Sequence, residues 1–260
     1  MLRHVISHLR RQDWMAVFIE LVVVVVGVFI GVQASNWNEQ RETDQKVAVF
    51  TERLRSDLRE EAWGYEMQVG YWSQVLANAK RVADALDGKA PLPDEALLIS
   101  AYRATQFNAY TRRRATYDEL TSTGEIGLIR DSALRDLAMS LYTDPLFNGV
   151  VQAGQQSEYR KAFRMALPYQ VQRALAERCG DHIAPVGDYR AIAHGLDYPC
   201  STGLPPDVIA AGDDALRKDP HLLASLQLRI ADVESDLGNM TVYYAHDFGE
   251  PLRRLAEQKP

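Results

Sequence analysis

Residues 21–32 read LVVVVVGVFIGV, an apolar run of twelve residues that no polar side chain interrupts. Extending the run to residues 14–35 adds only Glu20 and Gln33 as strongly polar groups. As a helix, residues 14–35 span about 33 Å at roughly 1.5 Å each, close to the roughly 30 Å hydrocarbon core of a bilayer. The run therefore predicts a transmembrane helix over residues 14–36 that contacts the lipid bilayer.

The ends of this run favour a retained signal anchor over two alternatives. Trp14 and Trp37 lie at its two ends, where amphipathic rings anchor a helix at the membrane interface. A buried core helix is disfavoured by five consecutive valines beside a second apolar half. A cleaved signal peptide is the other alternative, because residues 32–34 loosely fit the small-residue cleavage rule. The length of the run, Trp37 and the internal Glu20 favour retention.

Three positions in the predicted span are candidates for contact with another membrane helix. A carboxylate in lipid costs about 2–3 kcal/mol at the bilayer centre and less near the headgroups. Glu20 therefore either contacts a partner helix or extends its carboxylate to the interface. Gly27 and Gly31 form a GxxxG pattern, which permits close approach of two helices but also occurs in spans that do not pair.

Flanking charges predict the orientation. Lys and Arg residues accumulate on the cytoplasmic side of a span. The basic residues are Arg3, Arg10 and Arg11 before the span, and Arg41 and Lys46 after it, the latter diluted by Glu39, Glu42 and Asp44. We therefore expect a cytoplasmic amphipathic stub at 1–13, the anchor at 14–36 and an extracytoplasmic domain at 37–260.

Both cysteines, Cys179 and Cys200, fall in the predicted exported part. They flank a stretch rich in Gly and Pro, which we expect to form a loop over 179–205. An exported pair around an irregular loop favours a disulfide. Two free buried thiols are the alternative, and a metal pair is disfavoured because there is no CxxC spacing.

Apolar periodicity predicts an all-α helical bundle beyond the membrane. A heptad stripe over residues 62–86 continues the anchor into one long helix that ends near Leu86. A second striped helix begins after Asp219 and extends to about Tyr244. We expect these two to pair antiparallel, with a dimeric coiled coil as the alternative use of the stripes. Shorter helices are expected after Pro93, at 113–121, at 133–142, from Pro145 to about Arg178 with a kink at Pro168, and after Pro205.

Charged residues gather around the turn between two of these short helices. Helix caps and ion pairs within the bundle are one explanation for them. A binding site for a small anion or a partner protein is the other. The residues concerned are Arg113, Asp118, Glu119, Arg130 and Asp131.

The remaining sequence offers no chemistry of its own. We find no catalytic motif, no phosphate loop, no dinucleotide fingerprint and no zinc-type spacing, so no enzymatic activity, cofactor or metal is predicted. The formal net charge of −6 argues against a nucleic-acid binder.

Two segments resemble a family of uncharacterised bacterial single-pass membrane proteins. The first is Glu20, the apolar run with Gly27, then Gln33 and the sequence Asn-Trp-Asn-Glu at 36–39. The second comprises residues 116–120, Gly124 and residues 128–131. This resemblance implies the bacterial inner membrane and brings no catalytic residue with it.

The expected role is a membrane-anchored scaffold or protein-interaction module. Its partner would be a second copy, giving a homo-oligomer, or another membrane protein. The alternative is a ligand-sensing extracytoplasmic domain that signals through a partner.

The predicted orientation can be tested with a reporter enzyme that is active only outside the cytoplasm, fused after Lys259. We expect an active reporter, because the arginines before the span keep the N-terminus inside. The same reporter fused before the span should be inactive. The reverse result would refute both the orientation and the oxidising environment of the cysteines.

Overall fold

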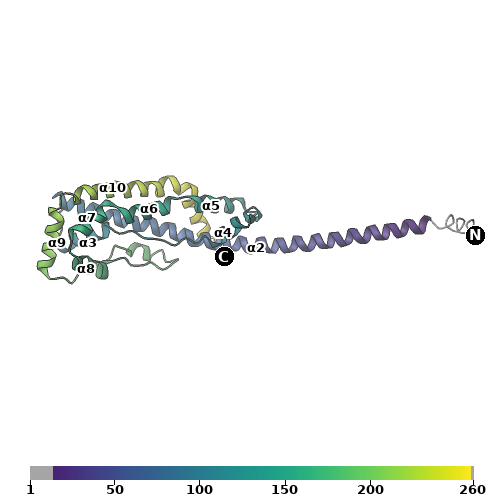
Figure 1. Ribbon diagram of the computed structural model, residues 1–260, viewed down its shortest axis with the longest axis horizontal. Helices are drawn as coiled ribbons and strands as arrows, with labels where there is room; N and C mark the ends of the chain where they lie inside the picture. The colour runs from purple at the N-terminus through teal and green to yellow at the C-terminus, as the bar shows by residue number, and fades with distance from the viewer. Residues whose placement is uncertain (1–13, 259–260) are drawn as a thin grey trace, which may run out of the picture. The chain divides into compact units, whose positions relative to one another are not determined.

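The computed structural model describes residues 14–258, with side chains from residue 18 onward. No strand occurs in this range, which confirms the predicted all-α class. The chain divides into two compact units, and we call residues 53–258 the helical domain. The α-helices, which Figure 1 labels except for α11, are α2 (Trp14–Leu86), α3 (Asp94–Ala104), α4 (Ala115–Ser122), α5 (Ser132–Thr143), α6 (Leu146–Gln156), α7 (Glu158–Ala166), α8 (Tyr169–Cys179), α9 (Pro206–Lys218), α10 (Leu222–Gly238) and α11 (Glu250–Glu257).

The N-terminal part of α2 is long and apolar enough to cross a membrane. The apolar side chains between Phe18 and Val32 are all exposed, and none of the span's most apolar window is buried. A helix that belonged to a protein core would be mostly buried. The described residues therefore contain no core that accounts for this run, and a membrane anchor does account for it. The predicted stub at 1–13 lies outside the described residues.

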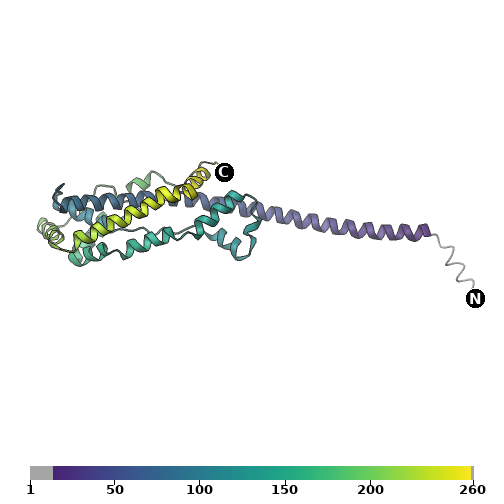
Figure 2. The same cartoon turned by 90° about the horizontal axis from the view of Figure 1, so that it is seen from above.

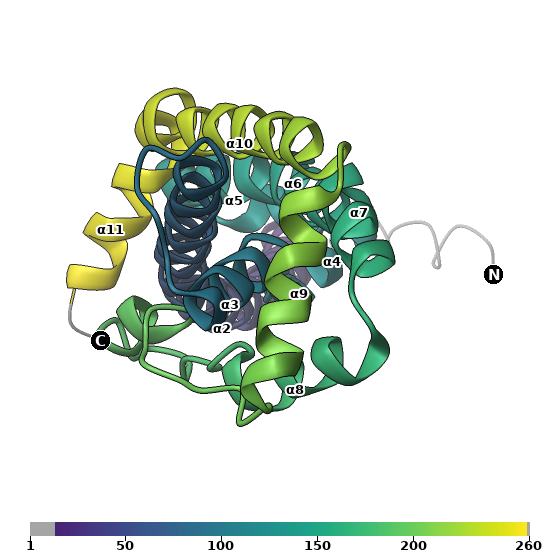
Figure 3. The same ribbon diagram turned by 90° about the vertical axis from the view of Figure 1, so that its left-hand side faces the viewer.

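From Arg53 onward, α2 forms the centre of the helical domain. Figure 3 shows α3, α9, α10 and α11 arranged around it. Trp72, Val75, Ala79 and Val82 are fully buried along this part of α2. The predicted heptad stripe is too narrow, because helices cover α2 on several sides and its buried face is wider than two heptad positions.

Helices α2 and α10 run antiparallel, as expected. Lys80 Nζ lies 2.6 Å from Glu234 Oε1. Further toward the N-terminus of α2, the Tyr65 hydroxyl donates a hydrogen bond to the carbonyl of Met240. Partner numbers thus rise on α10 as they fall on α2, and Figure 2 shows the two helices side by side.

The C-terminal helix departs from regular α winding. After α10 the chain forms two π-helical segments, Asn239–Tyr243 and Ala245–Gly249. The ring of Tyr65 packs edge-to-face against Phe248, with ring centroids 6.0 Å apart. Gly249 lies so close to Tyr65 that a Cβ there would be 2.9 Å from its hydroxyl oxygen. The π segments therefore fit the chain around the Tyr65 side chain.

The predicted continuous helix from Pro145 to Arg178 is wrong, because the structure has three helices there. Ser157 ends α6 and caps α7, its Oγ accepting a hydrogen bond from the Arg160 amide at 3.2 Å. Pro168 separates two helices rather than kinking one continuous helix. Leu167 before it is extended, at φ −109° and ψ 140°, as steric contact with a following proline favours.

The cysteine loop has little regular structure, yet the helices hold it firmly. Cys179 and Cys200 lie at disulfide distance, with Cα atoms 5.5 Å apart. The Gln74 side chain on α2 accepts hydrogen bonds from the amides of Leu196 at 2.7 Å and Asp197 at 3.0 Å. Gln74 also donates to the carbonyl of Ile192 at 2.8 Å. These bonds satisfy loop backbone groups that a free loop would expose to water.

Two leucines on α10 provide a matched test of the core. Leu226 is fully buried, whereas Leu228 is 51% exposed. We expect Leu226→Ala to lower the free energy of unfolding by about 2–5 kcal/mol, because it leaves a cavity. Leu228→Ala should change it by less than about 0.5 kcal/mol. Urea unfolding of the full chain in detergent measures both, and equal losses would contradict this packing.

Candidate binding surfaces

The charged residues predicted as an anion or partner site form ion pairs with α2. Glu119 on α4 lies 2.8 Å from Arg53, and Asp131 at the start of α5 lies 3.2 Å from Arg55. Arg113 Nε donates to Glu60 at 2.5 Å. We call this row of contacts the ion-pair seam. It joins the segment 113–131 to α2.

The innermost contact of the seam is a buried ion pair. Glu61 on α2 accepts a hydrogen bond from Arg112 Nε at 2.9 Å and one from the Arg113 amide at 2.6 Å. The side chains of Glu61 and Arg112 are only 3% and 11% exposed. Burial raises the pKa of Glu61, and the charge of Arg112 opposes that rise. The guanidinium also stacks over the rings of Tyr142 and Phe147.

The other two predicted site residues lie on the surface. Asp118 pairs with Arg114 on the same helix at 2.9 Å. Arg130 is exposed, next to the buried Ile129. Arg113, Asp118, Glu119 and Asp131 thus each have a partner of opposite charge within the helical domain. This favours the explanation by ion pairs over a free anion site.

An apolar groove that sequence reasoning missed lies beside the seam. We call it the Trp63 groove, a cavity of about 300 Å³. Trp63 and Met67 on α2 line one side, Tyr110 lies across from them, and Ile183 and Val186 of the cysteine loop border it. No sequence signal connects these residues, because they come from three distant segments.

The Trp63 groove combines a buried donor with exposed apolar side chains. Trp63 is 4% exposed, and its indole Nε1 has no hydrogen-bond acceptor among the described residues. Its ring meets that of Tyr110 edge-on at 6.0 Å. In contrast, Ile183 is 88% exposed and Val186 57% exposed. The groove therefore has an apolar rim, and the Trp63 ring that lines it carries an unsatisfied N–H group that is itself enclosed.

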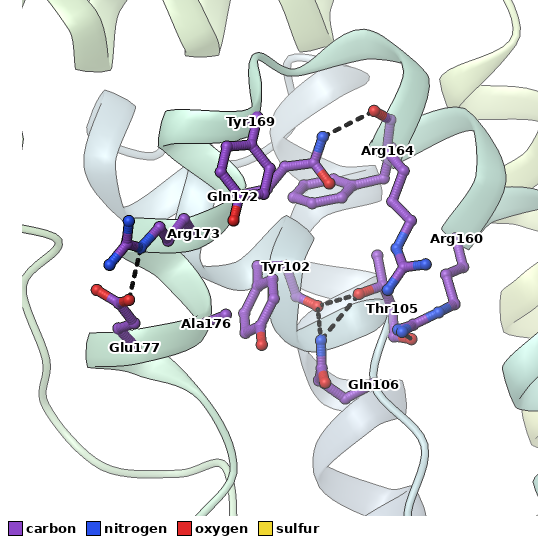
Figure 4. Close-up of a pocket in the computed structure, with 11 residues that line it drawn as sticks. Tyr102, Thr105, Gln106, Arg160, Arg164, Tyr169, Gln172, Arg173, Ala176 and Glu177 are labelled. Atoms are coloured by element: carbon purple, nitrogen blue, oxygen red, sulfur yellow. Dashed lines mark hydrogen bonds and ion pairs between the residues drawn. The ribbon is translucent and has the colours of Figure 1, made fainter.

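A second cavity, of about 390 Å³, lies between the end of α3 and the pair α7 and α8. We call it the arginine pocket, and Figure 4 shows the side chains that line it. Its charged side chains are those of three arginines and one glutamate. The residues that line it include Tyr102, Arg160, Arg164, Tyr169, Arg173 and Glu177.

The predicted membrane-contact residues are accessible on α2. Glu20, Gly27, Gly31 and Trp37 are all exposed, and a Cβ added at either glycine would meet nothing within 4 Å. The side chain of Trp14 lies outside the described residues. Pairing of this helix with another remains a prediction. Among the described residues there is also no cluster of three His, Cys, Asp or Glu that could hold a metal ion.

Comparison with known proteins identifies a family. Residues 20–161 match the model of a family of unknown function, DUF6090. The chain belongs to DUF6090. No curated protein and no solved structure matches the chain.

The DUF6090 match distinguishes the surfaces described above. It covers α2 from residue 20 onward and the whole ion-pair seam, and it ends within α7. The cysteine loop lies beyond the matched residues, as does α8. The Trp63 groove and the arginine pocket therefore each combine residues inside the match with residues outside it.

The seam predicts a large difference between its buried and exposed ion pairs. Glu61→Ala should lower the free energy of unfolding by about 3–5 kcal/mol, because it leaves the Arg112 charge buried without a partner. Asp118→Ala removes an exposed pair and should cost less than about 1 kcal/mol. Thermal unfolding of the full chain in detergent compares them. A cost for Asp118→Ala as large as that for Glu61→Ala would refute this account.

Proposed function

We propose that this protein is a single-pass protein of the bacterial inner membrane, with its N-terminus in the cytoplasm and its helical domain in the periplasm. One helix capable of spanning a membrane, basic residues before it and a family without known activity support this. The cysteine pair at disulfide distance also suits an oxidising compartment.

We propose further that the helical domain works as a protein-interaction module. The observation that carries this is the Trp63 groove. A buried donor without an acceptor costs about 1–3 kcal/mol, and a partner carbonyl would remove that cost on a turn of the Trp63 ring that brings its enclosed Nε1 to the groove. Burial of Ile183 and Val186 would add apolar area to the same interface.

The occupant we propose is an extended apolar segment of another membrane protein. An extended segment presents carbonyls that an indole N–H can reach and side chains that an apolar cavity can hold. The groove is bordered by residues 108–111, which lie outside any helix. Glu60 and Arg113 lie at the edge of the groove, but they form an ion pair with each other. Apolar contacts therefore dominate the recognition of a partner.

Ligand sensing is the second candidate function. The arginine pocket favours it, since a polar cavity of about 390 Å³ falls within the size range of small-molecule sites. A sensing role also requires a partner that relays the signal.

The docking proposal can be tested by photocrosslinking in intact membranes. A photoreactive residue at Ile183 should crosslink to a second protein, while one at Leu228 of α10, also exposed, should not. Val186→Asp in the same chain should abolish the adduct without lowering the melting temperature, because Val186 is exposed. Mass spectrometry should map the adduct to an apolar segment.

Three outcomes would overturn the proposal. These are the absence of an adduct at Ile183, equal adducts from Ile183 and Leu228, and survival of the adduct in Val186→Asp. An adduct of two copies of this chain would replace the heterologous partner with a homo-oligomer contact.

A further inference from the structure

The arginine pocket lies where three helices meet. The C-terminal end of α3 forms its floor, and α7 and α8 form its walls. The break at Leu167 and Pro168 turns the chain between α7 and α8, which lets both helices contribute side chains to one cavity. Figure 4 shows the rings of Tyr102 and Tyr169 on one side, and the guanidinium groups of Arg160 and Arg164 on the other.

The pocket carries more positive than negative charge. Glu177 is the only carboxylate among the described residues that line it, and it forms an ion pair with Arg173, with Arg173 Nε 2.7 Å from Glu177 Oε1. Arg160 has no carboxylate within ion-pair distance among the described residues; its Nη1 donates to the carbonyl of Thr105 at 3.0 Å. The Arg164 side chain forms neither an ion pair nor a hydrogen bond with any residue that the structure describes. Two guanidinium groups are therefore available to an anion.

The protein interior behind the pocket adds to this positive charge. Arg103 and Arg229 are buried, and each donates to backbone carbonyls rather than to a carboxylate. Burial lowers the pKa of Arg229 to about 10. Asp181 is a nearby carboxylate, and it accepts a hydrogen bond from the Tyr71 hydroxyl at 2.6 Å. The charges of Asp232 and Asp236 act on Arg229 and partly offset it.

The end of α3 explains part of this arrangement. Arg160 and Arg229 donate to the carbonyls of Thr105 and Gln106, where a helix C-terminus attracts cations. That terminus is equivalent to roughly half a negative charge. Asp181 acts on Arg160, and Asp232 and Asp236 act on Arg229, whereas the exposed Arg164 forms no ion pair among the described residues.

The surroundings of Arg160 disfavour its charged form. Burial lowers its pKa first, and the neighbouring charge of Arg164 lowers it further. A bound anion would offset both effects, because it supplies opposite charge and hydrogen-bond acceptors inside the pocket.

The opposite wall favours an organic rather than an inorganic anion. Tyr102 at the end of α3 and Phe163 on α7 supply apolar lining. Tyr169 stands at the rim, where it is 77% exposed although it is a large ring. A flat apolar group lying against these rings would bury that exposed surface.

We propose that the arginine pocket binds a small organic anion. Its carboxylate or phosphate group contacts Arg160 and Arg164, and its flat apolar body lies against Tyr102 and Tyr169.

The test is calorimetric titration of the full chain in a nonionic detergent at constant ionic strength. The probes are benzoate, phenyl phosphate, the neutral benzyl alcohol and inorganic phosphate. We expect saturable binding of at least one aryl anion, with benzyl alcohol and inorganic phosphate each at least tenfold weaker. These arms separate the requirement for charge from the requirement for an apolar body.

Three variants locate the site. Arg164→Gln should weaken binding of the aryl anion about tenfold, because it removes a charge-assisted contact. Tyr169→Ala should weaken it severalfold and bring it closer to the affinity for inorganic phosphate. Lys161→Gln removes the same charge from the same helix outside the pocket, and it should leave the affinity unchanged. Arg164 and Tyr169 are both exposed, so neither variant should prevent folding.

The proposal fails if neither aryl anion binds, or if benzyl alcohol binds as tightly as benzoate. It also fails if Lys161→Gln weakens binding as much as Arg164→Gln, since the effect would then reflect surface charge in general. Equal binding of inorganic and phenyl phosphate would overturn the assignment of the aromatic wall.

Discussion

The burial of the second half of α2 is the constraint on which the helical domain depends. Because other helices and loops cover much of this segment, the polar side chains on its covered side face protein rather than water and need specific partners. Glu61, Gln68 and Gln74 meet this need, because each binds backbone groups of an irregular connection. Gln68, for example, accepts from the Trp72 indole at 2.9 Å and donates to the carbonyl of Asn108 at 3.4 Å. The central helix therefore organises the loops as well as the core.

Local sequence was sufficient to predict the elements whose causes are local. The apolar run at 21–32 and the prolines and glycine after Leu86 indicate where α2 is apolar and where it ends. The break at Ser157 escaped prediction, because a serine cap without Gly or Pro resembles an ordinary polar position in an amphipathic helix. The stripe on α2 was too narrow for a different reason: periodicity shows that a helix has a buried face, but not how many neighbours it will acquire.

The candidate sites divide in the same way. The predicted charged residues at 113–131 are close in sequence, so their gathering could be predicted, and their use in ion pairs was one of the two explanations considered. Their partners on α2, such as Arg53 for Glu119, are far away in sequence and could not be predicted. The Trp63 groove and the arginine pocket could not be predicted. Each combines side chains from segments that are far apart in the chain, such as Trp63 and Ile183, and depends on how α2 is surrounded. The cysteine pair was visible in the sequence, whereas the role of Gln74 in holding the same loop was not.

The two π-helical segments determine the rotational phase of everything that follows them. A π turn holds more residues than an α turn, and each residue of an α-helix advances the side-chain direction by about 100°. The same residues wound as a regular α-helix would turn α11 about its own axis and carry Leu252 and Leu255 away from the interior, where both are now buried. The length of the segment between Gly238 and Glu250 is therefore as constrained as its composition, and a one-residue deletion there would act on side chains it does not touch.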